Sequence, residues 1–392
     1  MSGQIFDVAI VGAGLVGSSL ALALRGTGLS IALVEARPPA ALPQDASWDN
    51  RVYAISPGSV SFLEGIGAWA EVPTERIARI EAMAIFGDDG TARIDFNAYE
   101  AGLRELAYII ESRELQAILW LQLGAARDVT LFCPGECAAL EISDKAAHLT
   151  LRDGQTIAAN LIVAADGARS WVRSQAGIES HDKDYQQLGV VANFATEKPH
   201  QGTAYQWFQA EGALAYLPLP GNRISIVWSV QQAFAQELLQ LPATELCERV
   251  AEAGKLRLGK LELITPTAAF PLHLIEPRQL VKSRVALIGD AAHQVHPLAG
   301  QGVNLGFGDA RELASVLLNR GMREVGDNLL LRRYERARRE EILAMQLATD
   351  GLQGLFNNTQ PLLAWTRNTG LAITNRLAWI KHQLLKQALG NH

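Results

Sequence analysis

Short apolar runs alternate with glycine turns and helical stretches along much of the chain. The runs Val8–Val11, Ile31–Val34 and Leu161–Ala165 have the length of buried strands, and each is followed directly by a glycine or an acid. Continuous apolar strands separated by helices are typical of a mostly parallel sheet that is covered on both faces. The pattern therefore predicts an α/β fold.

The pattern changes between about residues 181 and 268. Here the β-prone runs Gly189–Phe194, Ala213–Leu219 and Ile224–Val230 lie between turn residues such as Pro220-Gly221-Asn222. Strands joined by short turns, without helices between them, indicate an antiparallel sheet. We expect this sheet to form a second domain.

Composition indicates a soluble globular protein. Of its 392 residues 48% are apolar and 19% are charged, and no apolar run reaches the ~18 residues of a membrane span. The formal net charge is −6, and no basic block precedes the C-terminal part. This distribution argues against a nucleic-acid partner and favours a small-molecule ligand.

Cysteine use and the first residues predict a cytoplasmic protein. Cys133, Cys137 and Cys247 are too few for a disulfide framework, and no second ligand pair stands at zinc-finger spacing from the first two. Residues 1–7 lack the basic segment that opens a secretory signal. We therefore expect a reducing environment.

The C-terminal residues 331–392 differ in charge from the rest of the chain. They hold nine Lys and Arg against four Asp and Glu, so this region carries +5 and the remainder −11. Their pattern is helical, with Trp365 and Trp379 among the basic residues. Such a region can pack on its own core, dock on another protein or contact anionic lipid, and the sequence leaves all three open.

A glycine-rich turn follows the first predicted strand. Gly12-Ala13-Gly14-Leu15-Val16-Gly17 opens a helix of small residues, and Glu35 ends the next strand, 23 residues after Gly12. Gly12 permits the tight turn, Gly14 lets backbone N–H groups approach a pyrophosphate, and Gly17 lets helix and strand pack closely. The acid accepts from a ribose and disfavours a 2′-phosphate, so we expect a dinucleotide other than NADP here.

A second polar segment follows the predicted strand Arg284–Ile288. Asp290, within Gly289-Asp290-Ala291-Ala292-His293, offers a carboxylate to sugar hydroxyls, and its small neighbours leave space for a ligand. The glycines of Pro297–Asn304 then expose backbone N–H groups at a helix start, where they stabilise negative charge such as that of a reduced flavin.

A third segment, Asp166-Gly167-Ala168-Arg169-Ser170, follows the predicted strand Leu161–Ala165, with Arg173 one turn further on. Ser170 is a good N-cap for a short helix that ends near Gly177. The charged residues of this segment are better explained by ligand binding than by structure alone.

These three segments, in this order and at these separations, resemble those of the class A flavoprotein aromatic hydroxylases. Within that class the chain is most similar to the ubiquinone-biosynthesis hydroxylases. The similarity extends over nearly the whole length, and its further elements are Asp49–Arg51, Ala54–Ser56, Tyr108–Glu111, Pro297–Gly306 and Arg367–Leu371. The set is specific, although no single member is.

The resemblance implies an α/β fold of two domains. These are a Rossmann-like FAD-binding domain of the glutathione-reductase and para-hydroxybenzoate-hydroxylase type and an inserted antiparallel-sheet substrate domain, followed by a helical C-terminal tail. The expected boundaries are 1–73, 100–180 and 269–330 for the FAD-binding domain, 74–99 and 181–268 for the substrate domain, and 331–392 for the C-terminal region.

The resemblance also implies the residues that bind FAD. For the ADP half these are Gly12, Gly14, Gly17 and Glu35, with Arg51 and Arg113 as further contacts. Asp290 is expected to bind the ribityl chain, and the isoalloxazine is expected to face Gly300, Gln301, Gly302, Val303 and Asn304. Asp166 and Arg169 are expected to serve both FAD and a nicotinamide donor that approaches transiently.

The activity implied is hydroxylation of the aromatic ring of a polyprenylated phenol or quinone precursor in ubiquinone biosynthesis. FAD is reduced by NAD(P)H or another donor, dioxygen forms a flavin C4a-hydroperoxide, and this delivers oxygen to the ring, while the protein excludes water. The expected partners are the substrate and a ubiquinone-biosynthesis complex. We also expect peripheral contact with the inner face of the cytoplasmic membrane through the C-terminal region.

Two other functions remain open on the same scaffold. One is another FAD oxidoreductase, such as a prenyl reductase or a halogenase, although the Trp-x-Trp-x-Ile-Pro element of halogenases is absent. The other is a non-catalytic flavin- or lipid-binding component of the biosynthetic complex.

Several side chains near these segments receive no catalytic role. His293 and His296 are followed by Pro297 without an acidic third ligand, so we expect a loop role beside the flavin and no metal site. The sequence assigns no catalytic base. The aromatic residues of the middle region can belong to the core or stack on a substrate ring; they are Tyr205, Trp207, Phe208, Tyr216 and Trp228.

Overall fold

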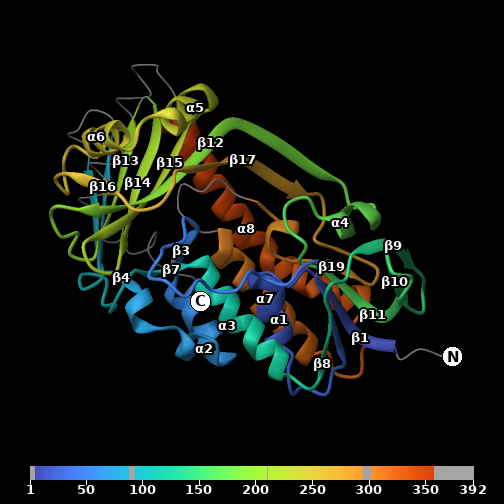
Figure 1. Ribbon diagram of the computed structural model, residues 1–392. Helices are drawn as coiled ribbons and strands as arrows, with labels where there is room; N and C mark the ends of the chain where they lie inside the picture. The colour runs from blue at the N-terminus through green and yellow to red at the C-terminus, as the bar shows by residue number, and fades with distance from the viewer. Residues whose placement is uncertain (1–4, 88–92, 210, 295–301, 357–392) are drawn as a thin grey trace.

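The computed structural model describes residues 5–87, 93–209, 211–294 and 302–356 (Figure 1). These residues form two large sheets with helices packed on them, and a small third sheet. The third sheet contains β3 (Val52–Ile55), β7 (Ala107–Glu111) and β4 (Ala78–Ile80) in the order β3-β7-β4.

The first sheet has eight strands in the order β18-β19-β11-β1-β2-β8, with β10 and β9 added beside β11. Their bounds are β1 (Ile5–Val11), β2 (Ile31–Val34), β8 (Val129–Phe132), β9 (Cys137–Ile142), β10 (Ala147–Leu151), β11 (Thr156–Ala164), β18 (Val281–Lys282) and β19 (Val285–Leu287). The neighbours of β1 and β2 are parallel, as is the pair of β11 and β19. The predicted α/β fold with a mostly parallel core sheet is confirmed.

Helices cover this sheet, which explains why its central strands are apolar without interruption. Val8, Ala9 and Ile10 of β1 are fully buried. The α1 helix contacts both α3 and α7, and α7 contacts α8. The helices of this part of the molecule are α1 (Leu15–Ala23), α2 (Pro57–Gly65), α3 (Ser112–Ala125), α4 (Trp171–Gln175), α7 (Gly302–Leu318) and α8 (Asn328–Phe356), with single 3₁₀ turns at Trp69–Glu71, Thr74–Arg76 and Gly289–Ala291.

The second sheet confirms the change of pattern in the middle of the chain. Its order is β16-β12-β15-β14-β13-β5-β6, with β17 also paired to β12, and all of its pairs are antiparallel except β5 with β13. The bounds are β5 (Ala82–Phe86), β6 (Arg93–Asn97), β12 (Ser180–Thr196), β13 (Thr203–Gln209), β14 (Gly212–Leu219), β15 (Arg223–Gln231), β16 (Leu261–Leu263) and β17 (Ala268–Pro277). The helices α5 (Gln232–Gln240) and α6 (Ala243–Ala253) pack on one face.

Four of the five aromatic residues that the sequence left between core and ring stacking lie in the core beneath α5 and α6, namely Tyr205, Trp207, Tyr216 and Trp228. Trp207 stacks on Tyr205 with ring centroids 5.7 Å apart, and the Tyr216 hydroxyl donates to the backbone of α6. Phe208 is also buried, and alternation along β13 places it on the opposite face. The role of these four side chains is packing.

The long strand β12 joins the two large sheets (Figure 1). Its first residues pair with the end of β17 near α4, and its later residues pair with β15 and β16 inside the second sheet. The register shifts between Asp184 and Leu188, where Gln186 has a φ of 55°. This irregularity bends the strand between the two sheets.

Candidate cofactor site

Three neighbouring parallel strands end at the same edge of the first sheet. Val11 of β1 is in register with Ala164 of β11, which is in register with Leu287 of β19. The ladder continues one residue further, because Ile288 N–H donates to the Ala164 carbonyl at 2.9 Å. The three predicted segments leave these three strands, so residues far apart in the chain meet where ligands bind in open α/β sheets.

Glycine is needed for different structural reasons at the three positions of the first segment. Gly12 has a φ of +102°, and a Cβ there would lie 2.3 Å from the Ala165 carbonyl oxygen. A Cβ on Gly17 would lie 2.0 Å from the carbonyl oxygen of Gly12. Gly14 is exposed, with no atom within 4 Å of its Cβ position, and α1 begins there without a side-chain cap. Gly12 and Gly17 thus serve packing, whereas Gly14 leaves space for a ligand beside free helix N–H groups.

Glu35, at the end of β2, reaches back to the glycine turn. Ala13 N–H donates to Glu35 Oε2 at 2.7 Å, and Gln116 Nε2 donates to the Ala13 carbonyl at 2.8 Å. The peptide at Ala13 is therefore held from both sides. The sequence pattern predicted the position of Glu35 but contained no signal for Gln116.

Asp290 lies on the 3₁₀ turn that follows β19. Gly289 and Ala291 are buried, but the Asp290 side chain is accessible to solvent. Protein around the carboxylate still removes part of its hydration, which raises its pKa, while the charges of His293 and Arg51 oppose the rise. The turn thus presents one acceptor group at the edge where the three strands end.

Asp166 and Arg173 have structural contacts that the sequence did not reveal. Asp166 accepts from the Ser170 hydroxyl at 2.5 Å and from Val172 N–H at 3.0 Å, so it caps α4. Ser170 is the N-cap, as predicted, and accepts from Arg173 N–H at 2.9 Å. The buried Arg173 guanidinium donates to the carbonyls of Ala168 and Ala291. Arg169 is exposed.

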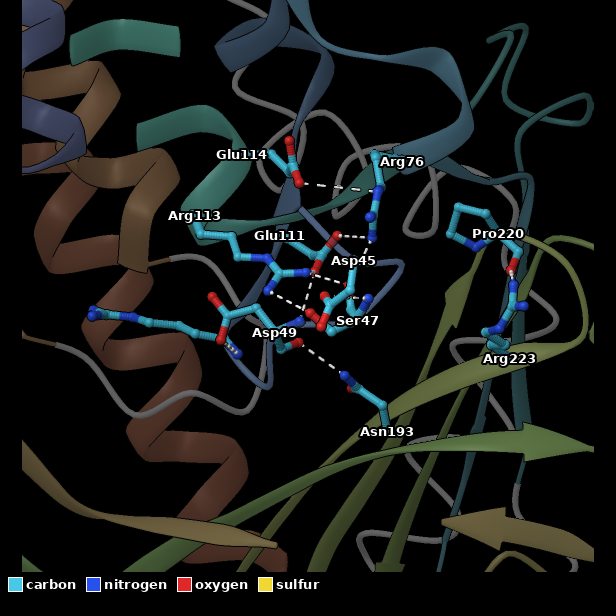
Figure 2. A network of polar contacts seen from close by, with 11 residues as sticks. Asp45, Ser47, Asp49, Arg76, Glu111, Arg113, Glu114, Asn193, Pro220 and Arg223 are labelled. Carbon is cyan, nitrogen blue, oxygen red and sulfur yellow. Dashed lines mark hydrogen bonds and ion pairs between the residues drawn. The ribbon is translucent and has the colours of Figure 1, made fainter. Parts of the chain in front are cut away.

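Arg113 belongs to a network centred on a buried acid, Glu111, at the end of β7 (Figure 2). The Glu111 carboxylate accepts from Asp49 N–H at 2.6 Å and lies 3.0 Å from both Arg76 and Arg113. Burial raises the pKa of Glu111, and the Asp49 N–H group and the two arginines act in the opposite direction. Arg113 also donates to the Ser47 side chain at 3.3 Å.

The segment 47–51 connects this network to the second sheet (Figure 2). Asn193 Nδ2 of β12 donates to the Asp49 carbonyl at 2.8 Å. The guanidinium carbons of Arg76 and Arg223 lie 4.8 and 5.5 Å from the Trp48 ring centroid. One cation reaches Trp48 from the 3₁₀ turn Thr74–Arg76 and the other from the start of β15 in the second sheet. Arg51, the last residue of the segment, is exposed, and its backbone N–H donates to Asp49 Oδ1 at 3.1 Å.

The start of α7 is fixed by Asn304. Its Oδ1 accepts from Ser56 N–H at 2.9 Å, and its Nδ2 donates to the Ala54 carbonyl at 2.8 Å. Val303 is buried, and no atom lies within 4 Å of the Cβ position of Gly302. The predicted contacts Gly300 and Gln301 lie outside the described residues, as does His296.

His293 lies outside helix and strand, as expected of a loop residue. It is buried, and its Nε2 lies 2.6 Å from Asp309 of α7. Sequence reasoning missed Asp309, although an acid among the apolar positions of α7 was a signal. Over the described ranges, no cluster of three or more His, Cys, Asp and Glu side chains is arranged to hold a metal ion.

Comparison with known proteins agrees with this geometry. Residues 6–348 match the model of a protein family described as FAD binding domain. The chain belongs to this FAD-binding family. The cofactor of the family is FAD, and exposed Gly14, the uncapped start of α1 and the accessible Asp290 carboxylate fit such a ligand.

Members of the FAD-binding family with curated names are similar over the full chain. The 3-demethoxyubiquinol 3-hydroxylase of Escherichia coli K12 is 38% identical over 396 residues, and the alignment covers 100% of both chains. Ubiquinone hydroxylase UbiL of Rhodospirillum rubrum is 34% identical and covers 99% of this chain and 90% of its own. The human mitochondrial ubiquinone biosynthesis monooxygenase COQ6 is 33% identical, with 97% and 92% covered.

Solved structures of other flavoproteins share the fold. PqsL of Pseudomonas aeruginosa superposes with a TM-score of 0.78 at 21% identity, covering 95% of this chain and 100% of its own. The p-nitrophenol 4-monooxygenase PnpA of Pseudomonas putida superposes with a TM-score of 0.78 at 19% identity, with 99% of both chains covered.

No helix in the described part of this chain is long and apolar enough to cross a bilayer.

Proposed function

We propose that this protein is an FAD-dependent monooxygenase that hydroxylates the aromatic ring of a polyprenylated phenol or quinol precursor in ubiquinone biosynthesis. The observation that carries the proposal is the 38% identity, over the whole of both chains, to a protein named 3-demethoxyubiquinol 3-hydroxylase. The relatives named ubiquinone hydroxylase UbiL and ubiquinone biosynthesis monooxygenase COQ6 support the same pathway.

The proposed FAD site follows the edge where β1, β11 and β19 end. The open space at Gly14 and the free N–H groups of α1 suit the diphosphate, and Glu35 suits the adenosine ribose. Asp290 suits the ribityl hydroxyls, and the start of α7 suits the isoalloxazine. The remaining proposed contacts are Gly12, Gly17, Arg51, Arg113, Asp166, Arg169, Gly300, Gln301, Gly302, Val303 and Asn304.

When bound, FAD would supply the redox chemistry: NAD(P)H would provide two electrons, and of the two atoms of dioxygen one would enter a ring C–H bond as a hydroxyl and the other would leave as water. The protein must hold the cofactor, orient the ring and exclude water. We propose that residues 74–99 and 181–268, which include most of the second sheet, form the substrate domain. The face of this sheet opposite α5 and α6 carries partly accessible small side chains, such as Ala213, Ala215 and Val227.

A polyprenylated substrate lies in the bilayer, so we propose that the protein works at the inner face of the cytoplasmic membrane. The net charge of +5 on residues 331–392 supports contact with anionic lipid. Removing the residues after 360 is expected to abolish sedimentation with anionic liposomes. If binding were unchanged, the same region would be assigned to docking on a biosynthetic complex, and retention of the truncated chain by that complex would test this.

The function is tested with the purified protein, FAD, NAD(P)H and a demethoxyquinol with a short prenyl chain. We expect substrate-stimulated oxidation of the nucleotide, with one hydroxylated product formed for each dioxygen consumed. In cells that lack this chain, mass spectrometry should detect the unhydroxylated precursor. A protein that binds FAD but forms no hydroxylated product from any pathway intermediate would overturn the proposal.

A further inference from the structure

A buried cluster of charged residues lies behind the turn that carries Asp290. Asp309 of α7 has no exposed surface. One of its oxygens, Oδ2, accepts from Gly289 N–H at 2.9 Å and lies 2.6 Å from His293 Nε2. The other, Oδ1, accepts from Arg338 Nε at 2.7 Å. One carboxylate therefore joins the turn, α7 and α8.

Arg338 supplies the compensating charge. It is 2% exposed, it donates to the Leu305 carbonyl at 3.0 Å, and it forms an ion pair with Glu341. Its guanidinium lies so close to α7 that a Cβ on Gly308 would be 2.8 Å from Arg338 Nη2. Burial acts to raise the pKa of Asp309, but His293 and Arg338 outweigh it and lower the pKa.

The cluster is one of three contacts that fix the turn. Gly289 has a φ of +59°, and its Cβ position is 3.2 Å from Val16 of α1. Arg173 donates to the Ala291 carbonyl at 2.9 Å on the other side. The backbone of the turn is thus held by α1, by α4 and, through Asp309, by α7 and α8. Asp290 is the one residue of Gly289–His293 whose side chain is exposed.

A buried charge on α7 with partners from the turn and from α8 is a costly way to gain stability, because its desolvation offsets most of the attraction. Such a buried cluster is nevertheless used in proteins to hold a neighbouring functional group in one orientation. We propose that Asp309, with His293 and Arg338, is a positioning residue that aims Asp290 at the hydroxyl-bearing chain of FAD. The inference rests on the proposed cofactor site and assigns no contact between Asp309 and the cofactor.

A double-mutant cycle on FAD affinity tests this inference. The dissociation constant of FAD is measured by fluorescence quenching for wild-type apoprotein, Asp309→Asn, Asp290→Ala and the double variant. If Asp309 acts through Asp290, Asp309→Asn weakens binding by roughly tenfold in the wild-type background and by less than about twofold in the Asp290→Ala background. Effects that add in the double variant, or unchanged affinity in Asp309→Asn, would overturn it.

Two further variants separate positioning from general stability. Arg284→Met removes another buried arginine of the same part of the molecule, which donates to the Asp144 and Asn160 carbonyls away from the turn. It is expected to lower the Tm and leave FAD affinity unchanged.

His293→Gln keeps a donor toward Asp309 and is expected to retain more FAD affinity than His293→Ala. This comparison tests the inference even if Asp309→Asn does not fold.

The outcomes distinguish the inference from the proposed function. Wild-type protein that fails to bind FAD would refute both. Wild-type protein that binds FAD, with an additive cycle or with equal affinities for the two His293 variants, would refute the positioning role alone.

Discussion

The Glu111 carboxylate lies 3.0 Å from the Arg113 guanidinium and has no exposed surface of its own. It lies 3.0 Å from Arg76 as well, and it accepts the backbone N–H of Asp49. One buried acid therefore holds both arginines and the segment that reaches Asn193 in the second sheet. Arg113, a proposed cofactor contact, is thus held by an acid that is itself fully buried.

Replacing Glu111 by Gln should destabilise the protein. The change leaves two partly buried arginines without their anion, at a cost of about 3 kcal/mol in the free energy of unfolding. Urea unfolding of the apoprotein measures this cost. The control is Glu136→Gln, because Glu136 pairs with Arg152 at 3.0 Å on the exposed surface. There the expected change is below about 1 kcal/mol, and equal losses in the two variants would contradict the role of Glu111.

The glycines of the first turn should respond differently to alanine. Gly14→Ala adds a methyl group in open space, so the stability of the apoprotein should be unchanged while FAD affinity falls by at least roughly tenfold, because the methyl occupies ligand space. Gly17→Ala places its methyl 2.0 Å from a carbonyl oxygen and should lower the stability of the apoprotein. Thermal melts and FAD titration check both. Unchanged FAD affinity in Gly14→Ala would contradict the proposed position of the diphosphate beside α1.

Asp290→Ala should weaken FAD binding by roughly 1–3 kcal/mol, or about 5- to 150-fold, because ligand hydroxyls lose an acceptor in a partly dehydrated place. Equilibrium dialysis or flavin fluorescence gives the dissociation constants. Asp153→Ala is the control, since Asp153 is an exposed acid in the turn between β10 and β11. Wild-type affinity in Asp290→Ala would exclude the proposed ribityl contact.

Asp309 should make stability sensitive to acid. Its folded-state pKa lies below the ordinary 3.8, because His293 and Arg338 outweigh the effect of burial. For an acid whose pKa is lowered on folding, the stabilisation is complete above the unfolded-state pKa and is lost as the pH falls through the folded-state pKa. The difference in unfolding free energy between wild type and Asp309→Asn should be constant from about pH 5 to 7 and shrink below about pH 4. Urea unfolding at several pH values measures it, and a difference that stays constant in acid would contradict the assignment.

Trp207 should behave as a core residue. Its ring is 3% exposed and stacks on Tyr205 and Phe86, so Trp207→Ala should cost about 3–5 kcal/mol in urea unfolding. Gln206→Ala, at the partly exposed neighbouring position on the opposite face, should change stability by less than about 0.5 kcal/mol. A stable Trp207→Ala protein with altered substrate preference would instead indicate a ring-binding role.

The fold, and the position of the three polar segments after strands of its parallel sheet, were predictable from local patterns. Buried parallel strands require continuous apolar runs, and glycine is required at positions 12 and 17 because a Cβ there would lie 2.3 and 2.0 Å from a backbone carbonyl oxygen. Ser170 has the side chain and the position of an N-cap, and it is one. The strands and the N-cap depend on residues close together in the chain, whereas the glycine pattern marks a turn whose close contact, that of Gly12 with Ala165, comes from another strand end.

The polar networks were not predictable in this way. Asp309 joins Gly289, His293 and Arg338 from different elements, and no spacing rule connects them. Charged residues at a strand end also do not reveal whether they bind a ligand or the backbone. Asp166 was expected to bind a ligand, and the sequence did not reveal that its carboxylate also caps α4. Buried polar partners are chosen by tertiary structure, which a single sequence does not contain.

Because β1, β11 and β19 are neighbours in one sheet, the sheet can be completed only late in the synthesis of the chain. β19 ends at Leu287, so nearly three quarters of the chain must leave the ribosome before the last of these strands can pair. At about 5–20 residues per second this takes roughly 15–60 s. During that interval the nascent N-terminal segment lacks the partners that complete its pocket. Flavin capture is therefore a late event in maturation, and chains that terminate before Val285 should remain colourless.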